Sequence, residues 1–271
     1  MLFYLVLAAA LALGALGAWG LGSLLWLPVL FVLAVAVLAG LAFAFLYLSC
    51  IWVDPEKPRE KDSPFFRGMA YVYIDAVIAA ARVRIHTKGL EQLPAEGRFL
   101  LVCNHRHDVD SALLLSVFKK NNLAFISKRE NSDMLIVGKI MPLISCQLIN
   151  RENDREALKT ILRCIQMLKQ DRVSVAVFPE GYIYDDRKLH RFRPGVFKIA
   201  QKANVPIVVC TLKNTTAVMP NFLKLKPTDV ELNLLRVITP QEYAGETTVD
   251  LANRVYEMMA ADLGPELVSQ E

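Results

Sequence analysis

The pattern of apolar and polar positions divides the chain into two unequal parts. Residues 1–53 carry no charged side chain, and all 31 basic and 27 acidic residues lie in residues 54–271. An uncharged apolar run of more than about 18 residues is typical of a membrane-spanning segment. A single straight helix of this run would be about 80 Å long, whereas the hydrocarbon core of a bilayer is only about 30 Å thick. We therefore expect the run to be interrupted.

The expected interruption lies between Gly20 and Pro28, where glycine and proline gather. It predicts two apolar helices, residues 2–19 and 29–52, with Pro28 at the start of the second, where its missing N–H is not needed. The pattern fits a membrane-anchoring helical hairpin over residues 1–53, or one crossing followed by a re-entrant helix. A cleaved signal peptide would need a positively charged start, and residues 1–4 carry no charge.

Basic residues gather directly after the second apolar segment. They are Lys57, Arg59, Lys61 and Arg67, and no Lys or Arg precedes them. The positive-inside rule then predicts that residues 54–271 lie on the cytoplasmic face of the cell membrane. Residues 54–81 are expected to form a juxtamembrane linker and a helix that begins after Ser63. This helix either lies at the membrane surface or packs into the core of the following domain.

From residue 82 onward, strand-like and helix-like segments alternate. Strands are expected at residues 82–87, 99–103, 124–127, 145–149, 173–178, 205–212 and 230–238, and helices at 111–119, 130–139, 154–170, 196–202 and 249–261. The helix at 154–170 is the clearest, because its apolar residues follow a spacing of three and four. Such alternation predicts an α/β domain over residues 82–271, with a mixed sheet covered by helices.

Charge and motif content exclude several classes of protein. A net charge of +4 over 271 residues gives no strong basic field, which argues against a nucleic-acid binder. The five cysteines form no C-x-x-C pair and are expected to be buried free thiols in a reducing compartment. The motifs of serine hydrolases and of P-loop proteins, G-x-S-x-G and G-x4-G-K-[ST], are both absent from the sequence.

Two loops that follow buried strands carry residues suited to chemistry, and ligand sites in open α/β sheets form beyond such strand ends. The first loop contains His105 and Asp110, and the second is residues 178–181. In a continuous helix, His105 and Asp110 would point about 140° apart. They can pair only if His105 lies in the loop and Asp110 lies in the first helical turn. An imidazole held by a carboxylate is the arrangement that a general base needs.

These two loops also resemble a known family. Asn104-His105, four residues and Asp110 match the N-H-x4-D signature of membrane glycerolipid acyltransferases, and residues 178–181 match their F-P-E-G block. Residues 148–151 and 205–208 resemble two further blocks of this family, and the four blocks occur in the family's order within residues 99–212. The group that the chain resembles is the 1-acylglycerol-3-phosphate acyltransferases, also called lysophosphatidic acid acyltransferases.

The resemblance implies transfer of a fatty acyl group from a thioester donor to the free hydroxyl of a lysophospholipid. The expected acceptor is 1-acylglycerol-3-phosphate, which would give phosphatidic acid at the bilayer. His105 is implied as the general base and Asp110 as its orienting partner. The donor is acyl-CoA or acyl-carrier protein, between which the sequence does not choose, and no metal or other cofactor is implied.

Further substrate-binding residues are implied by the resemblance, namely Asn104, Arg151, Glu180, Gly181, Arg187 and Arg193. Arg151 is expected to bind the acceptor phosphate. The family commonly continues its third block with an Arg shortly after the Gly, whereas Tyr182 follows Gly181 here. Either the basic residues that come later supply this contact, namely Arg187, Lys188, Arg191 and Arg193, or the enzyme acts on a different lysolipid acceptor.

Two alternatives of other classes remain open from the sequence. The cluster of His105, His107, Asp108 and Asp110 is rich in metal-ligand types, which would fit a metal-dependent membrane-bound hydrolase. The F-P-E-G block has no part in such a site, and a strong chelator would distinguish the two enzymes. The other alternative is a non-catalytic membrane scaffold of the same fold. The presence of both His105 and Asp110 favours an enzyme.

Overall fold

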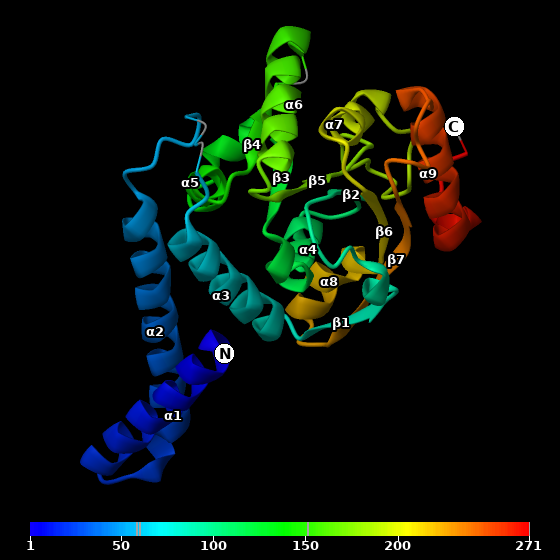
Figure 1. The fold of residues 1–271 in the computed structure, drawn as a ribbon. Coiled ribbons are helices and arrows are strands. Elements are labelled where there is room, and N and C mark those ends of the chain that lie inside the picture. The colour runs from blue at the N-terminus through cyan, green and yellow to red at the C-terminus, as the bar shows by residue number, and fades with distance from the viewer. Residues whose placement is uncertain (58, 60, 151, 271) are drawn as a thin grey trace.

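The computed structural model describes the whole chain except residues 58, 60, 151 and 271 (Figure 1). Its helices are α1 (Leu2–Gly20), α2 (Leu27–Cys50), α3 (Pro64–Ala80), α4 (Val109–Val117), α5 (Val137–Leu143), α6 (Asp154–Lys169), α7 (Lys198–Ala203), α8 (Val218–Leu223) and α9 (Thr248–Leu263). Its strands are β1 (Val83–Lys88), β2 (Leu100–Cys103), β3 (Leu123–Lys128), β4 (Gln147–Ile149), β5 (Ser174–Val177), β6 (Ile207–Lys213) and β7 (Thr228–Ile238).

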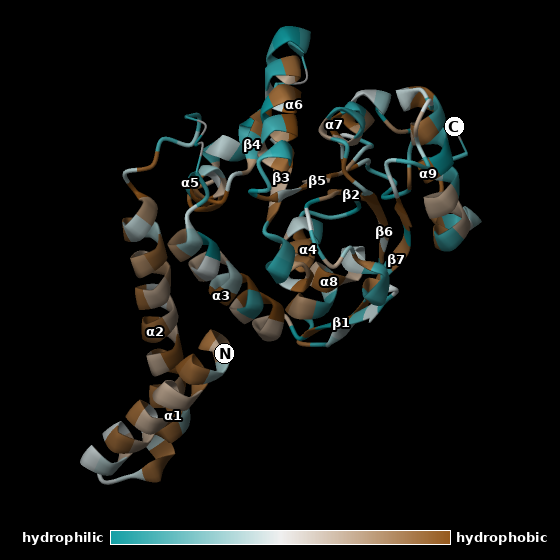
Figure 2. Cartoon of the chain, in the orientation of Figure 1, coloured by the Kyte–Doolittle hydropathy of each residue, from teal (hydrophilic) through white to brown (hydrophobic). Residues whose placement is uncertain are grey.

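Helices α1 and α2 form a helical hairpin that projects from the rest of the molecule (Figure 1). Both helices are long and apolar enough to cross a membrane (Figure 2), and most of their side chains are not buried. The helices approach closely at Gly14, where an added Cβ would lie 3.1 Å from the backbone nitrogen of Phe31. Small residues permit this kind of close contact between membrane helices. The predicted interruption between Gly20 and Pro28 is confirmed.

Helix α3 joins the hairpin to the α/β domain. It begins as predicted, because the Ser63 hydroxyl accepts the backbone N–H of Phe66 and Pro64 occupies the first turn. One side of α3 packs against the domain, with Met69 and Ala70 buried. Of the two predicted alternatives for this helix, packing into the core of the domain therefore applies to this side of α3.

A buried arginine fixes α3 to the sheet. Arg67 is only 4% exposed, and its guanidinium forms an ion pair with Asp62 at 2.6 Å. The same guanidinium donates to the carbonyl oxygens of Leu123, the first residue of β3, and Ile144, which precedes β4. The charge is thus both paired and hydrogen-bonded, as a buried cation requires.

The seven described strands form one mixed sheet in the order β1-β7-β6-β2-β5-β3-β4. Strands β6 and β7 are antiparallel, and the other neighbouring pairs are parallel. Helices α3, α4, α5 and α8 cover one face of the sheet, and α6, α7 and α9 cover the other (Figure 1). The predicted fold class, a mixed sheet covered by helices, is confirmed.

The core on the α3 face extends into the hairpin. Leu46 and Cys50 near the end of α2, and Val53 just after it, are buried in the same cluster as Met69 and Phe99. All five cysteines are free and buried, as predicted. The last turn of α2 is therefore part of the hydrophobic core of the α/β domain.

Two local predictions differ from the structure. The segment 130–139 was expected to be one helix, but a short 3-10 helix (Arg129–Asp133) is followed by α5. Gly138 packs directly on the carbonyl of Ser132, so the chain folds back at this point. Helix α8 was not predicted, because it is only six residues long and exposes apolar side chains on its outer side.

Candidate active site

The predicted loops meet because the strands before them are neighbours. Strands β2 and β5 pair in parallel, so their carboxyl ends lie at the same edge of the sheet. Asn104 follows β2 directly and is fully buried. Its Nδ2 donates to the Leu212 carbonyl at 3.0 Å, and the Leu212 N–H donates to its Oδ1 at 2.7 Å. The side chain of Asn104, predicted to contact substrate, joins the loop to β6.

His105 and Asp110 form the predicted pair. His105 Nδ1 lies 2.9 Å from Asp110 Oδ2, and Asp110 is in the first turn of α4. The same oxygen accepts the backbone N–H groups of Arg106 at 2.7 Å and His107 at 2.8 Å. The Asp110 side chain is fully buried, whereas that of His105 is 17% exposed. The pair therefore leaves the Nε2 of His105 as the nitrogen available to a ligand.

The ring of His105 is held on its flat side as well. It stacks on Phe178 with the ring centroids 3.9 Å apart and the planes 9° from parallel. Phe178, the first residue of the F-P-E-G block, also stacks on Phe125 at 5.7 Å. One side of the imidazole is thereby covered by an aromatic ring, while Asp110 fixes its rotation.

Glu180 connects the two loops through their main chains. Its Oε1 accepts the backbone N–H of His105 at 2.7 Å, and its Oε2 accepts that of His190 at 3.0 Å. The side chain is 1% exposed, and burial raises the pKa of its carboxyl to about 8, although both hydrogen bonds favour the charged form. Glu180, predicted to shape the acceptor site, holds the backbone that carries His105.

Gly181 makes room for Arg193. Its φ of +82° is a conformation that favours glycine, and an added Cβ would lie 2.8 Å from Nε of Arg193. The Arg193 N–H donates to the Pro179 carbonyl at 2.8 Å, and its guanidinium lies over the Tyr182 ring at 5.0 Å. Gly181 and Arg193 are thus in contact beside the F-P-E-G block.

Arg187 and Arg106 bind each other's main chain. Arg106 Nε donates to the Arg187 carbonyl at 2.6 Å, and Arg187 Nη1 donates to the Arg106 carbonyl at 3.1 Å. Arg106 is 8% exposed, and burial lowers its pKa while the charges of Asp110 and Glu180 oppose this. Arg106 was not predicted, and the only available signal was its place inside the first loop. Arg187 therefore lies beside the His105 loop, where it holds the backbone.

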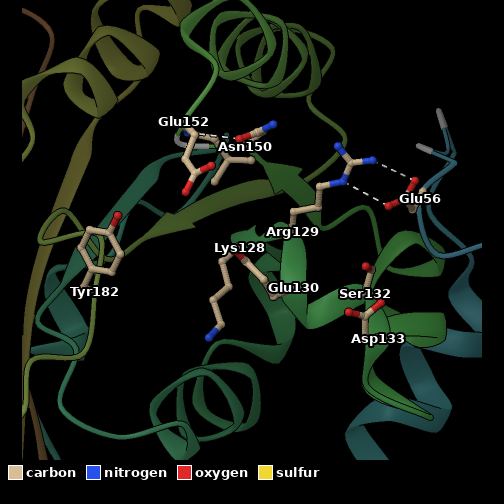
Figure 3. A pocket seen from close by; sticks show the side chains of 10 residues that line it. Glu56, Lys128, Arg129, Glu130, Ser132, Asp133, Asn150, Glu152 and Tyr182 are labelled. Atoms are coloured by element: carbon tan, nitrogen blue, oxygen red, sulfur yellow. Dashed lines mark hydrogen bonds and ion pairs between the residues drawn. The ribbon is translucent and has the colours of Figure 1, made fainter.

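A polar pocket of about 500 Å³ lies at the carboxyl ends of β3 and β4 (Figure 3). Arg129 lines it and is paired with Glu56 at 3.0 Å. Lys128, the last residue of β3, also lines it and forms no ion pair with another described residue. The pocket therefore offers an exposed cation at the same sheet edge as His105.

The pocket includes both neighbours of Arg151. Asn150 and Glu152 line it, and so does Tyr182, which follows Gly181 (Figure 3). Arg151, the predicted phosphate ligand, lies outside the described residues. The motif block at residues 148–151 and the residue after the F-P-E-G block thus contribute to one pocket.

The residues of the proposed metal cluster do not converge on one point. His107 accepts the backbone N–H of Val109 at its Nδ1, at 3.3 Å. Among the residues that the structure describes, no group of three or more His, Cys, Asp or Glu side chains could hold a metal ion. The geometry therefore favours a His105–Asp110 pair over a ligand cluster.

Comparisons with known proteins find acyltransferases. Residues 84–213 match the family model Acyltransferase. A 1-acyl-sn-glycerol-3-phosphate acyltransferase of Chlamydomonas reinhardtii is 30% identical over 75% of this chain and 61% of its own length. A probable enzyme of the same name from Mycoplasma pneumoniae is 34% identical over 49% of this chain and 50% of its own. The chain thus spans about half to three fifths of the length of these relatives.

A solved structure shares the fold. It is the crystal structure of the 1-acyl-sn-glycerophosphate (LPA) acyltransferase PlsC from Thermotoga maritima, with a TM-score of 0.61 and 22% identity. The match covers 73% of this chain and 78% of that one. At this identity, the likeness shows the fold.

Residues 84–213 therefore form a domain of the acyltransferase family. Its relatives carry the name 1-acyl-sn-glycerol-3-phosphate acyltransferase, and this confirms the family predicted from the four motif blocks. With its two apolar N-terminal helices, the chain is a membrane protein.

Proposed function

We propose that this protein transfers a fatty acyl group from a thioester donor to the free hydroxyl of 1-acylglycerol-3-phosphate, with phosphatidic acid as product. The observation that carries the proposal is the pair of His105 Nδ1 and Asp110 Oδ2, 2.9 Å apart. The relatives named for this reaction support the choice of acceptor. The pair leaves Nε2 of a partly exposed imidazole at the sheet edge where the two motif loops meet.

The proposed reaction uses His105 as a general base. Its Nε2 accepts the proton of the acceptor hydroxyl as the hydroxyl oxygen attacks the thioester carbonyl. Asp110 stabilises the resulting imidazolium through Nδ1. The tetrahedral intermediate then collapses, the carbon–sulfur bond breaks, and the proton passes from Nε2 to the departing thiolate. A thioester is already electrophilic, so positioning and base catalysis provide the acceleration.

We place the acceptor phosphate in the pocket that Lys128 lines. Arg151 is the proposed bidentate ligand, because its sequence neighbours Asn150 and Glu152 line this pocket. Lys128 is a second proposed ligand, since no other described residue pairs with it. Arg187 is a weaker candidate, because its guanidinium already donates to the Arg106 carbonyl.

The acyl donor in this proposal is acyl-CoA or acyl-carrier protein, and the reaction needs no metal or other cofactor. The deciding assay crosses several lysophospholipid acceptors with both donors, using purified full-length protein. His105→Ala should lower kcat by at least ~100-fold, the usual range for a positioned acid–base group. His107→Ala is the matched control, because its imidazole does not contact Asp110, and it should retain most activity. Equal activity of the two variants would overturn the mechanism.

A chelator adds an independent arm to this assay. Activity should survive a strong chelator. Loss of activity that zinc specifically restores would instead favour the metal-dependent hydrolase.

We also propose that the catalytic domain faces the cytoplasm. The four basic residues after α2 support this orientation by the positive-inside rule. With a hairpin, labelling tags at both chain ends should be shielded from an impermeant reagent outside intact cells. A labelled C-terminal tag would overturn the orientation, and a labelled N-terminal tag alone would show a single crossing.

A further inference from the structure

An apolar patch lies on the surface of the α/β domain, on α8 and directly after it. We define the α8 patch by four apolar residues, Met219, Phe222, Leu223 and Leu225. It also includes two lysines, Lys224 between Leu223 and Leu225, and Lys226 directly after Leu225. Leu223 is 75% exposed and Leu225 is 69% exposed. Large apolar side chains that gather on a surface in this way mark a contact site.

The backbone of the patch is held in an unfavourable conformation. Leu225 has a φ of +55°, a left-handed conformation that is costly for a residue with a Cβ. Its carbonyl accepts a hydrogen bond from Arg82 Nη1 at 2.6 Å. The fold thus maintains a strained turn whose side chain is exposed to solvent rather than packed in the core. Strain of this kind is characteristic of functional surface segments.

The patch is joined through Arg82 to α3, the helix that connects the domain to the hairpin. Arg82, which binds the Leu225 carbonyl, follows α3 after a single residue. Helix α3 in turn contacts α2, since the Tyr73 hydroxyl donates to the Ala42 carbonyl at 2.7 Å. On α3, the side chain of Val77 is 65% exposed. The end of α2, α3 and α8 therefore pack into the core on the same face of the sheet (Figure 1).

We propose that the α8 patch inserts into the surface of an anionic phospholipid bilayer and forms a second membrane contact beside the hairpin. Its apolar side chains would enter the interface between headgroups and acyl chains. Lys224 and Lys226 would extend to the lipid phosphates. This contact holds the domain against the bilayer on its α3 and α8 side.

The charges favour a bilayer over a second copy of the chain. In a two-fold contact, the same patch meets itself. Lys224 and Lys226 would then face the same two lysines of the other copy, which is a like-charge contact without an acidic partner in the patch. An anionic lipid surface complements the same lysines.

Lipid-quenching fluorescence tests the proposal on the full-length protein in vesicles of phosphatidylcholine and phosphatidylglycerol. All five native cysteines are buried, so Leu223→Cys can be labelled selectively with an environment-sensitive fluorophore. Leu162→Cys is the matched control, because Leu162 is 55% exposed on α6, on the opposite sheet face. Nitroxide lipids with a shallow label should quench the probe at 223 several-fold more strongly than the probe at 162. Equal quenching, or self-quenching between copies without lipid quenching, would overturn the proposal.

Two variants test the parts of the patch separately. Lys224→Glu with Lys226→Glu should weaken the lipid quenching in anionic vesicles and not in neutral ones, and unchanged quenching would overturn the role of anionic lipid.

Leu225→Asn removes an apolar side chain but suits the left-handed conformation, so folding should be retained. It should reduce quenching of the probe at 223, and quenching equal to that of the parent chain would contradict insertion. Neither result depends on the proposed acyl transfer.

Discussion

The two loops at the carboxyl ends of β2 and β5 each contain a buried carboxylate, but the two carboxylates hold different parts of the chain. Asp110 binds the imidazole of His105 and two backbone N–H groups within four residues of itself. Glu180 binds only backbone N–H groups, and these belong to His105 and His190. The first carboxylate orients a side chain, and the second orients a main chain.

This difference gives Asp110 a role in the chemical step and Glu180 a role in stabilising the fold. A replacement of Asp110 alters the charge next to the imidazole, so it should act on the rate of the chemical step. A replacement of Glu180 alters the junction between two loops, so it should act first on stability. Of the four predictions below, given in order of decreasing effect, the first and the last test this division, and the other two test the phosphate pocket and the turn at Gly181.

Asp110→Asn should lower kcat by ~100-fold or more, because an amide of the same shape cannot stabilise the imidazolium. Steady-state acyl transfer with saturating donor and acceptor measures the effect. Glu180→Gln is the matched isosteric control and should lose much less kcat. If both variants lose the same factor, the two carboxylates do not have separate roles.

Arg151→Ala should reduce kcat/KM for a phosphate-bearing acceptor by roughly 10- to 150-fold, as expected for loss of a charged hydrogen bond. Arg151→Lys should recover part of this, and Lys128→Ala should show a smaller loss in the same parameter. The KM of the acyl donor should stay constant. Arg236→Ala is the control, since Arg236 lies on β7, pairs with Glu242 and does not line the proposed phosphate pocket.

A different order of effects among the arginine variants would place the phosphate site elsewhere. If Arg151→Ala is without effect while Arg187→Ala or Arg193→Ala impairs the acceptor kinetics, the phosphate lies beside the loop after Gly181. If none of the three variants affects the acceptor, the acceptor carries no phosphate at that position.

Gly181→Ala should lower stability by about 1–3 kcal/mol, because a side chain is strained at a φ of +82° and would press on Arg193. The thermal unfolding midpoint in a fixed detergent measures this. Gly195→Ala is the control, since no atom lies within 4 Å of the added Cβ. Equal midpoints for the two variants would show that the contact between Gly181 and Arg193 carries no strain.

The free energy of unfolding should decline as the pH rises from about 5 to 8, because of Glu180. Its pKa is about 8 in the folded chain and 4.5 ordinarily, so the folded state retains a proton that the unfolded state releases. The stabilising effect of Glu180 is complete below pH 4.5, its ordinary pKa. It is lost as the pH rises through about 8, its pKa in the folded chain. This group contributes a slope of at most about 1.4 kcal/mol per pH unit. Glu180→Gln should flatten the slope of unfolding free energy against pH. If the slope stays unchanged in this variant, groups other than Glu180 cause it.

The sequence predicted the His105–Asp110 pair because both residues lie within one short loop and the following helical turn. It could not predict the roles of Asn104 and Glu180, whose partners are main-chain groups 108 and 75 residues away. Main-chain partners leave no mark in the residue pattern, so both side chains were expected to contact substrate. Helix α8 lacked the apolar period that revealed α6, because its apolar residues face outward.

The burial of Leu46, Cys50 and Val53 in the core of the domain has a practical consequence for anyone who wants a water-soluble fragment. Cutting the chain after residue 53 would remove these three side chains and expose Met69 and its neighbours on α3. Each large buried apolar side chain contributes roughly 1.5–3 kcal/mol. A fragment that starts at residue 54 should therefore aggregate, whereas one that keeps the last two turns of α2 has a complete core to fold around.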